Sequence, residues 1–191
     1  VAARAAADFE EAVRIFPNDP GMWNTLGYFY TLTKNYEAAR RAYGRGVRAD
    51  PSNAMLPENL AGVSRQLGIR NDPDLAWLAS YGRLERLAAS PEPVPPRDLE
   101  SADALLAQDP ANHKVRLLRA KLYFKAGRLP EAKAALEGLL KEKPGDNQAR
   151  YGLAVVYEKE GNLPLARAEW ERFLQLEPGN AAVQQRLQSL R

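Results

Sequence analysis

The chain has 191 residues, of which 45% are apolar, and its 27 basic and 24 acidic residues leave a net charge of +3. This length fits one or two domains, and the interspersed charges argue against the one-sided basic surface that is typical of nucleic-acid binding. Because there is no cysteine and His113 is the only histidine, disulfides, thiolate catalysis, zinc–thiolate sites and histidine-cluster metal sites are excluded. No apolar run approaches the ~18 residues of a membrane span and no signal-peptide pattern is visible, which leaves cytoplasmic and periplasmic locations open.

The first predicted element is a helix over about 2–16. No earlier helix in the sequence pairs with it. We therefore expect Phe9 and its neighbours to leave an apolar face uncovered, so that either preceding repeats cover this face or the helix associates with another chain.

Residues 20–53 predict a pair of helices, and the first contains the stretch "GMWNTLGYFY". Gly27 stands at its centre, between Trp23 and Tyr30, although a glycine inside a helix costs about 0.5–1 kcal/mol relative to alanine. We expect this small residue to let the second helix of the pair approach closely while the aromatic side chains fill the space around the contact.

The second helix of this pair carries a group of arginines at helical spacing. We interpret them as a solvated face, with an acidic partner or nucleic acid as the alternative. The three that share one face are Arg41, Arg45 and Arg48.

Residues 54–110 depart from the pattern of helix pairs. Three helices are predicted there, over about 56–67, 74–89 and 98–109, and the first of them has no partner in this interpretation. The loop at 90–96, "SPEPVPP", is rich in proline and favours an extended connection. It is either a plain spacer or a polyproline-type ligand or hinge.

Two further helix pairs are predicted over 113–146 and 147–180, followed by a short polar capping helix in 181–191. Gly127 and Gly161 are expected to end the first helix of each pair, and Pro130 and Pro164 lie in the first turn of the second helices, where a missing N–H is harmless.

Prolines recur at a fixed interval along the chain. The step from Pro17 to Pro51 equals the steps between successive members of the set Pro110, Pro144 and Pro178. With small and aromatic residues at the same phase, this repeat interval of about 34 residues resembles the tetratricopeptide repeat of bacterial proteins, closely over about 1–53 and 111–180. The resemblance implies an all-α fold in one domain over 1–191, a right-handed superhelical solenoid of antiparallel helix pairs. In it, 1–17 is the second helix of a partial repeat, 20–53, 113–146 and 147–180 are repeats, and 54–110 is irregular.

The resemblance also implies a function, that of a scaffold for protein–protein interaction. In this family the first helices line a concave groove that binds a peptide or helix of a partner. We find no catalytic motif and expect no enzyme activity, no cofactor, no metal, no nucleic-acid partner and no membrane span. The positions that match the groove of the family are Asn24, Tyr28, Thr31, Lys114, Leu117, Lys121, Phe124, Lys125, Gln148, Tyr151, Val155 and Glu158.

The sequence supports one of two narrower roles within the family and does not support the other. The carboxylate-clamp class requires lysine and asparagine where this chain has Asn24 and Tyr28, so that class is not supported. Residues 74–145 resemble, more weakly, tetratricopeptide factors of bacterial cytochrome c maturation, which would make the chain an envelope assembly factor or chaperone. His113, at the start of a helix, is interpreted as a surface or capping residue.

Overall fold

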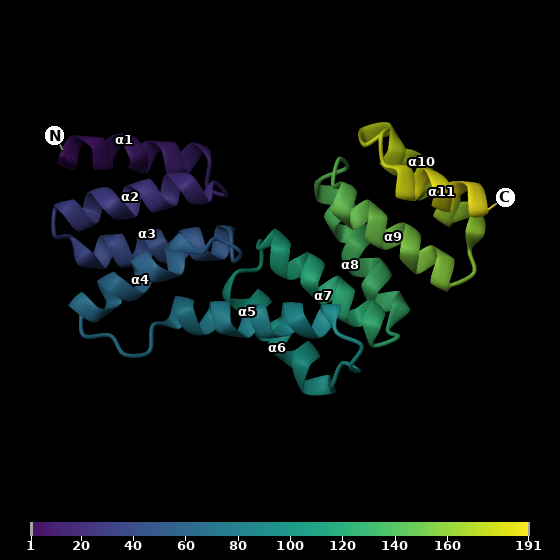
Figure 1. The fold of residues 1–191 in the computed structure, drawn as a ribbon, viewed down its shortest axis with the longest axis horizontal. Coiled ribbons are helices and arrows are strands. Elements are labelled where there is room, and N and C mark those ends of the chain that lie inside the picture. The colour runs from purple at the N-terminus through teal and green to yellow at the C-terminus, as the bar shows by residue number, and fades with distance from the viewer. Residues whose placement is uncertain (1, 191) are drawn as a thin grey trace. The chain divides into compact units, whose positions relative to one another are not determined.

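The computed structural model describes residues 2–190, and these residues form eleven α-helices and no strand (Figure 1). The all-α prediction is confirmed. Within the described residues, no helix combines the length and the apolarity that crossing a bilayer requires. The helices are α1 (Ala2–Ile15), α2 (Pro20–Leu32), α3 (Tyr36–Ala49), α4 (Met55–Gln66), α5 (Pro73–Ala89), α6 (Pro96–Gln108), α7 (His113–Lys125), α8 (Leu129–Glu142), α9 (Asn147–Lys159), α10 (Leu163–Leu176) and α11 (Ala181–Ser189).

A capping residue stands two positions after each of the recurring prolines. Its side-chain oxygen accepts hydrogen bonds of 2.8–3.2 Å from backbone N–H groups at the start of the next helix. These bonds satisfy donors that have no partner inside the helix. The capping residues are Asp19, Asn53, Asn112, Asp146 and Asn180.

The turns inside the helix pairs repeat as well. Gly127 and Gly161 have φ of 75° and 76° just after the first helices, which confirms their predicted role as helix ends. Gly68 has the same conformation after α4, with φ of 71°, and Lys34 has it after α2, with φ of 58°. Lys34 therefore occupies a left-handed position that glycine adopts without steric cost.

Gly27 packs as its sequence context predicts. A Cβ atom at this position would lie 2.5 Å from the ring of Tyr43, which belongs to α3 and is buried. The small residue therefore allows the close contact between α2 and α3.

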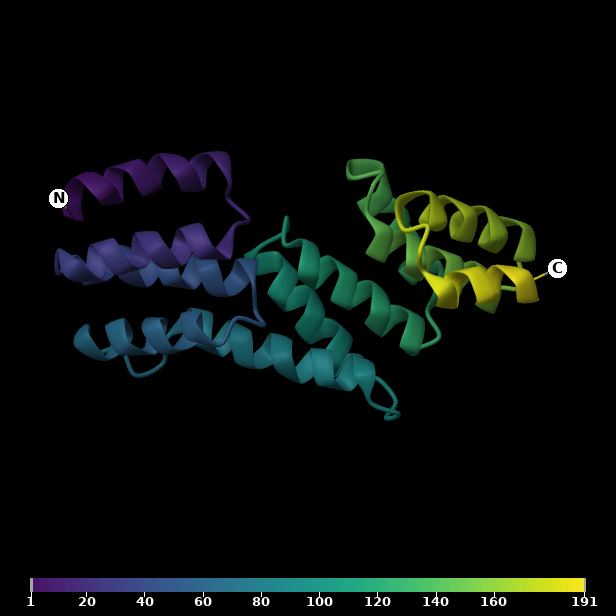
Figure 2. The ribbon, with the colours of Figure 1, turned by 45° about the horizontal axis from the view of Figure 1, so that its top comes forward.

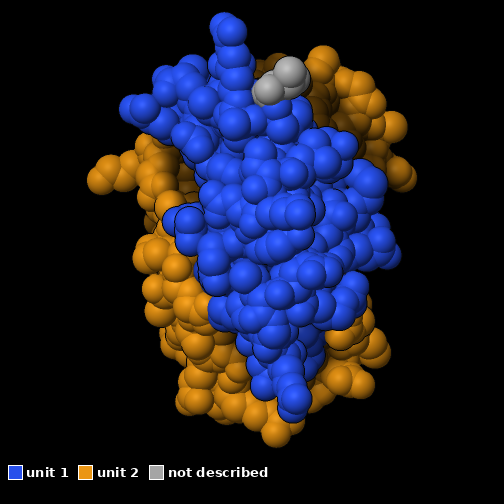
Figure 3. All heavy atoms as spheres, turned by 90° about the vertical axis from the view of Figure 1, so that its left-hand side faces the viewer, with its two compact units in different colours: residues 1–83 blue, residues 84–191 orange. Residues whose placement is uncertain are grey.

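The contacts divide the chain into two compact units, residues 1–83 and residues 84–191 (Figure 3). In unit 1, α1, α2, α3 and α4 pack in chain order (Figures 1 and 2), around a core that includes Val47, Leu56 and Leu60. In unit 2, α6 to α11 pack in chain order and α7 also contacts α9. The organisation as one solenoid domain over 1–191 stays a prediction.

The three middle helices lie close to their predicted bounds, but α4 is not unpartnered. Its bounds fall one repeat interval after those of α2, to within a single position. It packs on α3, and Leu75 and Leu78 of α5 contact the core that it shares with α3. The repeat of about 34 residues therefore continues regularly as far as Gly68, and the chain departs from it only after that residue.

Helix α5 explains why the middle of the chain is shorter than two repeats. Moving α3 forward by one repeat interval gives 70–83, and moving α7 back by one interval gives 79–91. The single helix at Pro73–Ala89 overlaps both ranges. Helix α5 therefore takes the place of the second helix that would follow α4 and also of the first helix that would precede α6. The boundary between the two units falls within α5, after Arg83.

Charged side chains hold the start of α5 in unit 1. Asp72 is buried; its carboxylate accepts hydrogen bonds from Ser64 Oγ at 2.7 Å and from Arg40 Nη1 at 3.3 Å. Asp74 accepts one from Arg48 Nε at 2.6 Å, and it lies so close to Gly44 that a Cβ atom there would overlap its Oδ2.

These contacts correct the interpretation of the arginine face. The Arg48 side chain is only 16% exposed, and its guanidinium lies 5.3 Å from the ring centre of Trp77. Its acidic partner is Asp74 of the same chain, whereas Arg41 and Arg45 are exposed.

The end of α5 is held within unit 2. Lys125 Nζ, from the last residue of α7, donates to the backbone carbonyls of Leu87 and Ser90. A cation at the last carbonyls of a helix satisfies acceptors that lack intrahelical partners. The loop that follows ends with Pro95 in an extended conformation and Pro96 in the first turn of α6.

Candidate functional site

The predicted site residues of unit 1 lie on α2 beside α4. Asn24 accepts a hydrogen bond of 2.9 Å from the side-chain amide of Asn59, which links the two helices. Thr31 Oγ1 donates to the backbone carbonyl of Gly27 at 2.8 Å. Tyr28 is 53% exposed and is therefore the most accessible of the three predicted residues here.

On α7 the predicted residues divide between surface and core. Leu117 is only 6% exposed, so it belongs to the core and does not offer a contact surface. Lys121 is exposed, and Lys114 and Phe124 are partly buried. Lys125 is also partly buried, because its ammonium group caps the end of α5.

On α9 an exposed tyrosine rests on buried aromatic rings. The Tyr151 side chain is 49% exposed, and its ring lies edge-on to Trp170 with 4.9 Å between the centres. Gln148 is exposed nearby, and Val155 is partly buried against the cluster around Trp170. Tyr151 therefore presents an accessible ring whose position is fixed by its contact with Trp170.

Glu158 links three helices instead of standing free. Its carboxylate accepts from Trp170 Nε1 of α10 at 2.6 Å and from Arg186 Nε of α11 at 2.8 Å. The hydrogen bonds from Arg186 are the main cause that lowers the pKa of Glu158, with the one from Trp170 contributing. This residue holds the last helix in place.

His113 is the first residue of α7, as expected for a residue at a helix start. Its Nε2 lies 2.9 Å from Asp146 Oδ2, and Asp146 also caps α9. The side chain is 43% exposed and joins the starts of two neighbouring first helices.

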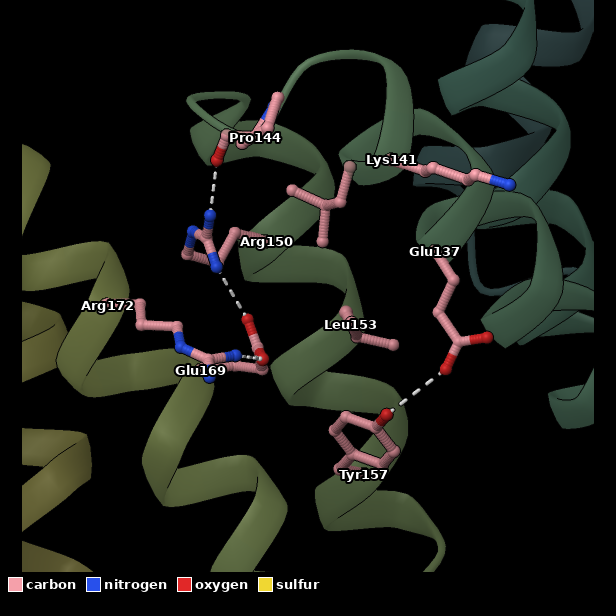
Figure 4. Close-up of a pocket in the computed structure, with 9 residues that line it drawn as sticks. Glu137, Lys141, Pro144, Arg150, Leu153, Tyr157, Glu169 and Arg172 are labelled. Atoms are coloured by element: carbon pink, nitrogen blue, oxygen red, sulfur yellow. Dashed lines mark hydrogen bonds and ion pairs between the residues drawn. The ribbon is translucent and has the colours of Figure 1, made fainter.

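A cavity of about 440 Å³ in unit 2 is a feature that no sequence motif indicates (Figure 4). It opens between α8 and α10, with α9 at its base. The residues that line it are Glu137, Leu140, Lys141, Pro144, Arg150, Leu153, Tyr157, Glu169 and Arg172.

A buried carboxylate organises one end of this cavity. Glu169 accepts from Arg150 Nη1 at 2.8 Å and from Arg172 Nη1 at 2.5 Å, and a second nitrogen of Arg150 donates to the carbonyl of Pro144 (Figure 4). The Nε atom of Arg150 is buried and has no hydrogen-bond partner among the described residues.

At the other end of the cavity, the Tyr157 hydroxyl donates to Glu137 at 3.2 Å (Figure 4). Burial is the largest cause that raises the pKa of Tyr157, and Glu137 adds to it. Lys133, which pairs with Glu160 at 3.1 Å, lies 5.9 Å from the centre of the Tyr157 ring.

Comparison with known proteins places these helices in a family. The model of the tetratricopeptide repeat matches residues 2–54, 99–146 and 117–181, which together are more than half of the chain. The peroxisomal targeting signal receptor of Saccharomyces cerevisiae is 40% identical over 60 residues, which are 31% of this chain and 10% of the receptor. The chain thus matches about a tenth of the length of that relative.

Two solved structures resemble the chain over nearly its whole length. Yeast Tom70 is 16% identical, with a TM-score of 0.53 over 97% of this chain and 42% of Tom70. The tetratricopeptide domain of P58(IPK) is 12% identical, with a TM-score of 0.52 over 99% of this chain and 50% of that structure. At these identities the likeness is one of fold.

Proposed function

The chain belongs to the tetratricopeptide repeat family, and on that premise we propose that it is a non-catalytic scaffold that binds a peptide segment or helix of a partner protein. The binding surface is the exposed face of the first helices α7 and α9, with Tyr28 of α2 as a further contact residue within unit 1. A repeat scaffold serves protein–protein interaction, and the fold alone leaves the choice of partner to the side chains on this face.

The observation that carries the proposal is the accessible aromatic ring of Tyr151. Tyr151 is half exposed yet rests edge-on against Trp170 and Phe173, with ring centres 4.9 and 6.0 Å away. Such a ring offers contact area with little loss of side-chain freedom on binding. Lys121 is exposed on α7, the neighbouring first helix, and suits an acidic group of the ligand.

The yeast relative supports a peptide as ligand. By its name it is a receptor for a targeting signal, and it shares 60 aligned residues with this chain. For this chain, a peptide ligand follows as part of the proposal.

The test is affinity capture from the source organism with matched variants. The double variant Lys121→Ala, Tyr151→Ala removes the cation and the ring, and we expect it to lose the partner that the unaltered chain retains. Lys159→Ala, an exposed lysine at the end of α9, is the control and should retain it. Equal retention by the double variant, with its helix content intact, would show that this face is not the binding surface.

The role of an envelope assembly factor in cytochrome c maturation stays a prediction. It rests on the weaker likeness of residues 74–145, and neither the yeast receptor nor the two solved structures are such factors by name. Peptides from the C-terminal ends of apocytochromes provide the test, because binding is expected if the role is right and no binding if it is wrong.

Self-association through α1 also stays a prediction, but its residues change. Phe9 does not lie on an uncovered face, because it packs against Phe29 with 5.7 Å between the ring centres. The exposed apolar residues at this end are Ile15 and Phe16, 61% and 54% exposed. Light scattering of the chain and of an Ile15→Ser, Phe16→Ser variant should give a larger mass for the unaltered chain if this end self-associates.

A further inference from the structure

We propose that the cavity between α8 and α10 is a second binding site, for an extended peptide segment in which an apolar side chain is followed by acidic ones. Residues of the second helices α8 and α10 line its sides and Arg150, Leu153 and Tyr157 of α9 line its base, whereas none of the residues proposed for the first-helix face lines it. Its volume of about 440 Å³ lies within the range of ~300–1,000 Å³ for ligand pockets.

One repeat earlier, an arginine occupies the position that corresponds to Leu153. There, Arg119 of α7 has its Nε 2.8 Å from Asp103 Oδ1 of α6. Its guanidinium lies 5.1 Å from the ring centre of Tyr123 and donates to the hydroxyl of that ring at 3.0 Å. Arg128 covers the same ring at 4.9 Å.

One of the differences between the repeats lies at the base of the cavity. Tyr123 and Asp103 correspond, one repeat interval later, to Tyr157 and Glu137, but Arg119 corresponds to Leu153. The leucine is too short to reach Glu137, whose carboxylate accepts from Tyr157 instead, and it has no charge to neutralise. The exchange of a long cationic side chain for a short apolar one therefore leaves space beside Glu137 and Tyr157.

The apolar part of the cavity suits one side chain of a ligand. Leu140, Leu153 and the Tyr157 ring line it (Figure 4). An apolar group that enters this space is removed from water together with these side chains, which favours binding. Glu137 stands at this end, so a second acidic group here would be repelled.

The other end of the cavity suits an acidic group. The Arg172 side chain is 59% exposed, and Glu169 holds both Arg150 and Arg172 at this end, whereas Lys141 of α8 points away from them (Figure 4). The buried Nε of Arg150 lacks a hydrogen-bond acceptor, and a buried donor without an acceptor is unfavourable. A carboxylate of the ligand can accept from the exposed guanidinium of Arg172.

The first test fills the cavity by copying the earlier repeat. Leu153→Arg should place a guanidinium between Glu137 and Tyr157, as Arg119 lies between Asp103 and Tyr123, and the variant is expected to fold because that arrangement already exists in the molecule. Leu153→Met, which adds no charge to the cavity, is the control. The probe is a fluorescein-labelled nine-residue peptide with one phenylalanine followed by two aspartates in an alanine–glycine background.

We expect the probe to bind the unaltered chain and the Leu153→Met variant alike, and Leu153→Arg to bind at least tenfold more weakly. A matched peptide with two lysines in place of the aspartates should not bind. The double variant Lys141→Glu, Arg172→Glu should also bind the probe at least tenfold more weakly. If Leu153→Arg loses its helix content, this double variant is used to test the site instead.

Methyl NMR spectra during the titration separate this site from the first-helix face. Shifts at Leu140 and Leu153 support the proposal. The Lys121→Ala, Tyr151→Ala variant, which we expect to lose partner binding at the first-helix face, should leave these shifts unchanged. Shifts confined to Val155 and Leu187, no binding at millimolar peptide, or equal binding by a folded Leu153→Arg variant would each overturn the proposal.

Discussion

The regular repeats and helix α5 are held together by different means. The repeats rely on caps, left-handed turn residues and small side chains that recur at the repeat interval, and most of the hydrogen bonds involved span only a few positions. The start of α5 is anchored by charged pairs between distant residues, such as Arg40 with Asp72, which are 32 positions apart. Distant ion pairs also join the regular helices, as between Arg186 and Glu158. Helix α5 overlaps two repeat positions, and its ion pairs with α3 supply contacts that the recurring caps and turn residues do not provide.

The largest effect is expected at the start of α5. Asp72→Ala removes a buried carboxylate that caps the helix and neutralises Arg40, so the free energy of unfolding should fall by about 3 kcal/mol, as for a broken buried ion pair. Urea unfolding of the chain measures it. Asp72→Asn keeps the cap and should lose less, while a loss below about 0.5 kcal/mol for the alanine variant, the level of a surface substitution, would contradict the charged anchor.

The next effect compares two glycines of unit 1. Gly27→Ala places a Cβ atom 2.5 Å from the Tyr43 ring, and we expect a loss of about 2 kcal/mol from overpacking. Gly62→Ala is the matched control, because the nearest atom, on Arg65, lies 4.0 Å away; this change should stabilise the chain by about 0.5–1 kcal/mol. The packing argument fails if both variants change the stability equally.

A reciprocal exchange tests the left-handed turns. Lys34→Gly should raise the free energy of unfolding by about 1 kcal/mol, since lysine at a φ of 58° carries a steric cost that glycine lacks. Gly127→Lys introduces the same cost at the equivalent position and should lower it by a similar amount. Thermal unfolding of the two variants, measured side by side, should show Tm shifts of opposite sign. Shifts of the same sign would show that the left-handed conformation at these two positions does not determine the effect of the substitutions.

The smallest effect appears only at alkaline pH. Burial and a hydrogen bond to Glu10 raise the pKa of Tyr30 from 10.0 to about 12. Between about pH 10 and pH 12 the unfolded tyrosine loses its proton while the folded one keeps it, so stability should fall across this window. Urea unfolding on both sides of the window should show a smaller fall for Tyr30→Phe than for the unaltered chain; an identical fall would place the cause elsewhere.

Much of the fold is readable from the sequence because its determinants are local. The prolines, the glycines at 127 and 161 and the small residue at 27 each act on neighbouring backbone or on the adjacent helix, and the prolines and turn glycines recur at one period. The capping residues share that phase, so stretches such as "EPGN" mark both the end of one helix and the start of the next.

The sequence does not predict the contacts of α5 or which candidate site residues are exposed, and both have the same cause. The burial of Asp72, Lys125 and Glu158 depends on which distant side chain or backbone carbonyl each one contacts, and position in a repeat does not specify that partner. Leu117 matches a groove position of the family but packs into the core. The family pattern does not indicate the cavity at Leu153, because both repeats match that pattern. The sequence difference at this site appears only when Leu153 is compared with Arg119, its equivalent one repeat earlier.

The central claim is that the regular first helices carry partner binding while α5 serves structure. The most direct measurement places a photo-reactive benzoylphenylalanine at Lys121 or at Tyr151, and in a separate variant at Glu85, an exposed residue of α5. After irradiation in extracts of the source organism, we predict one protein partner cross-linked from positions 121 and 151 and none from position 85. Cross-linking from position 85 alone, or equally from all three positions, would contradict the claim.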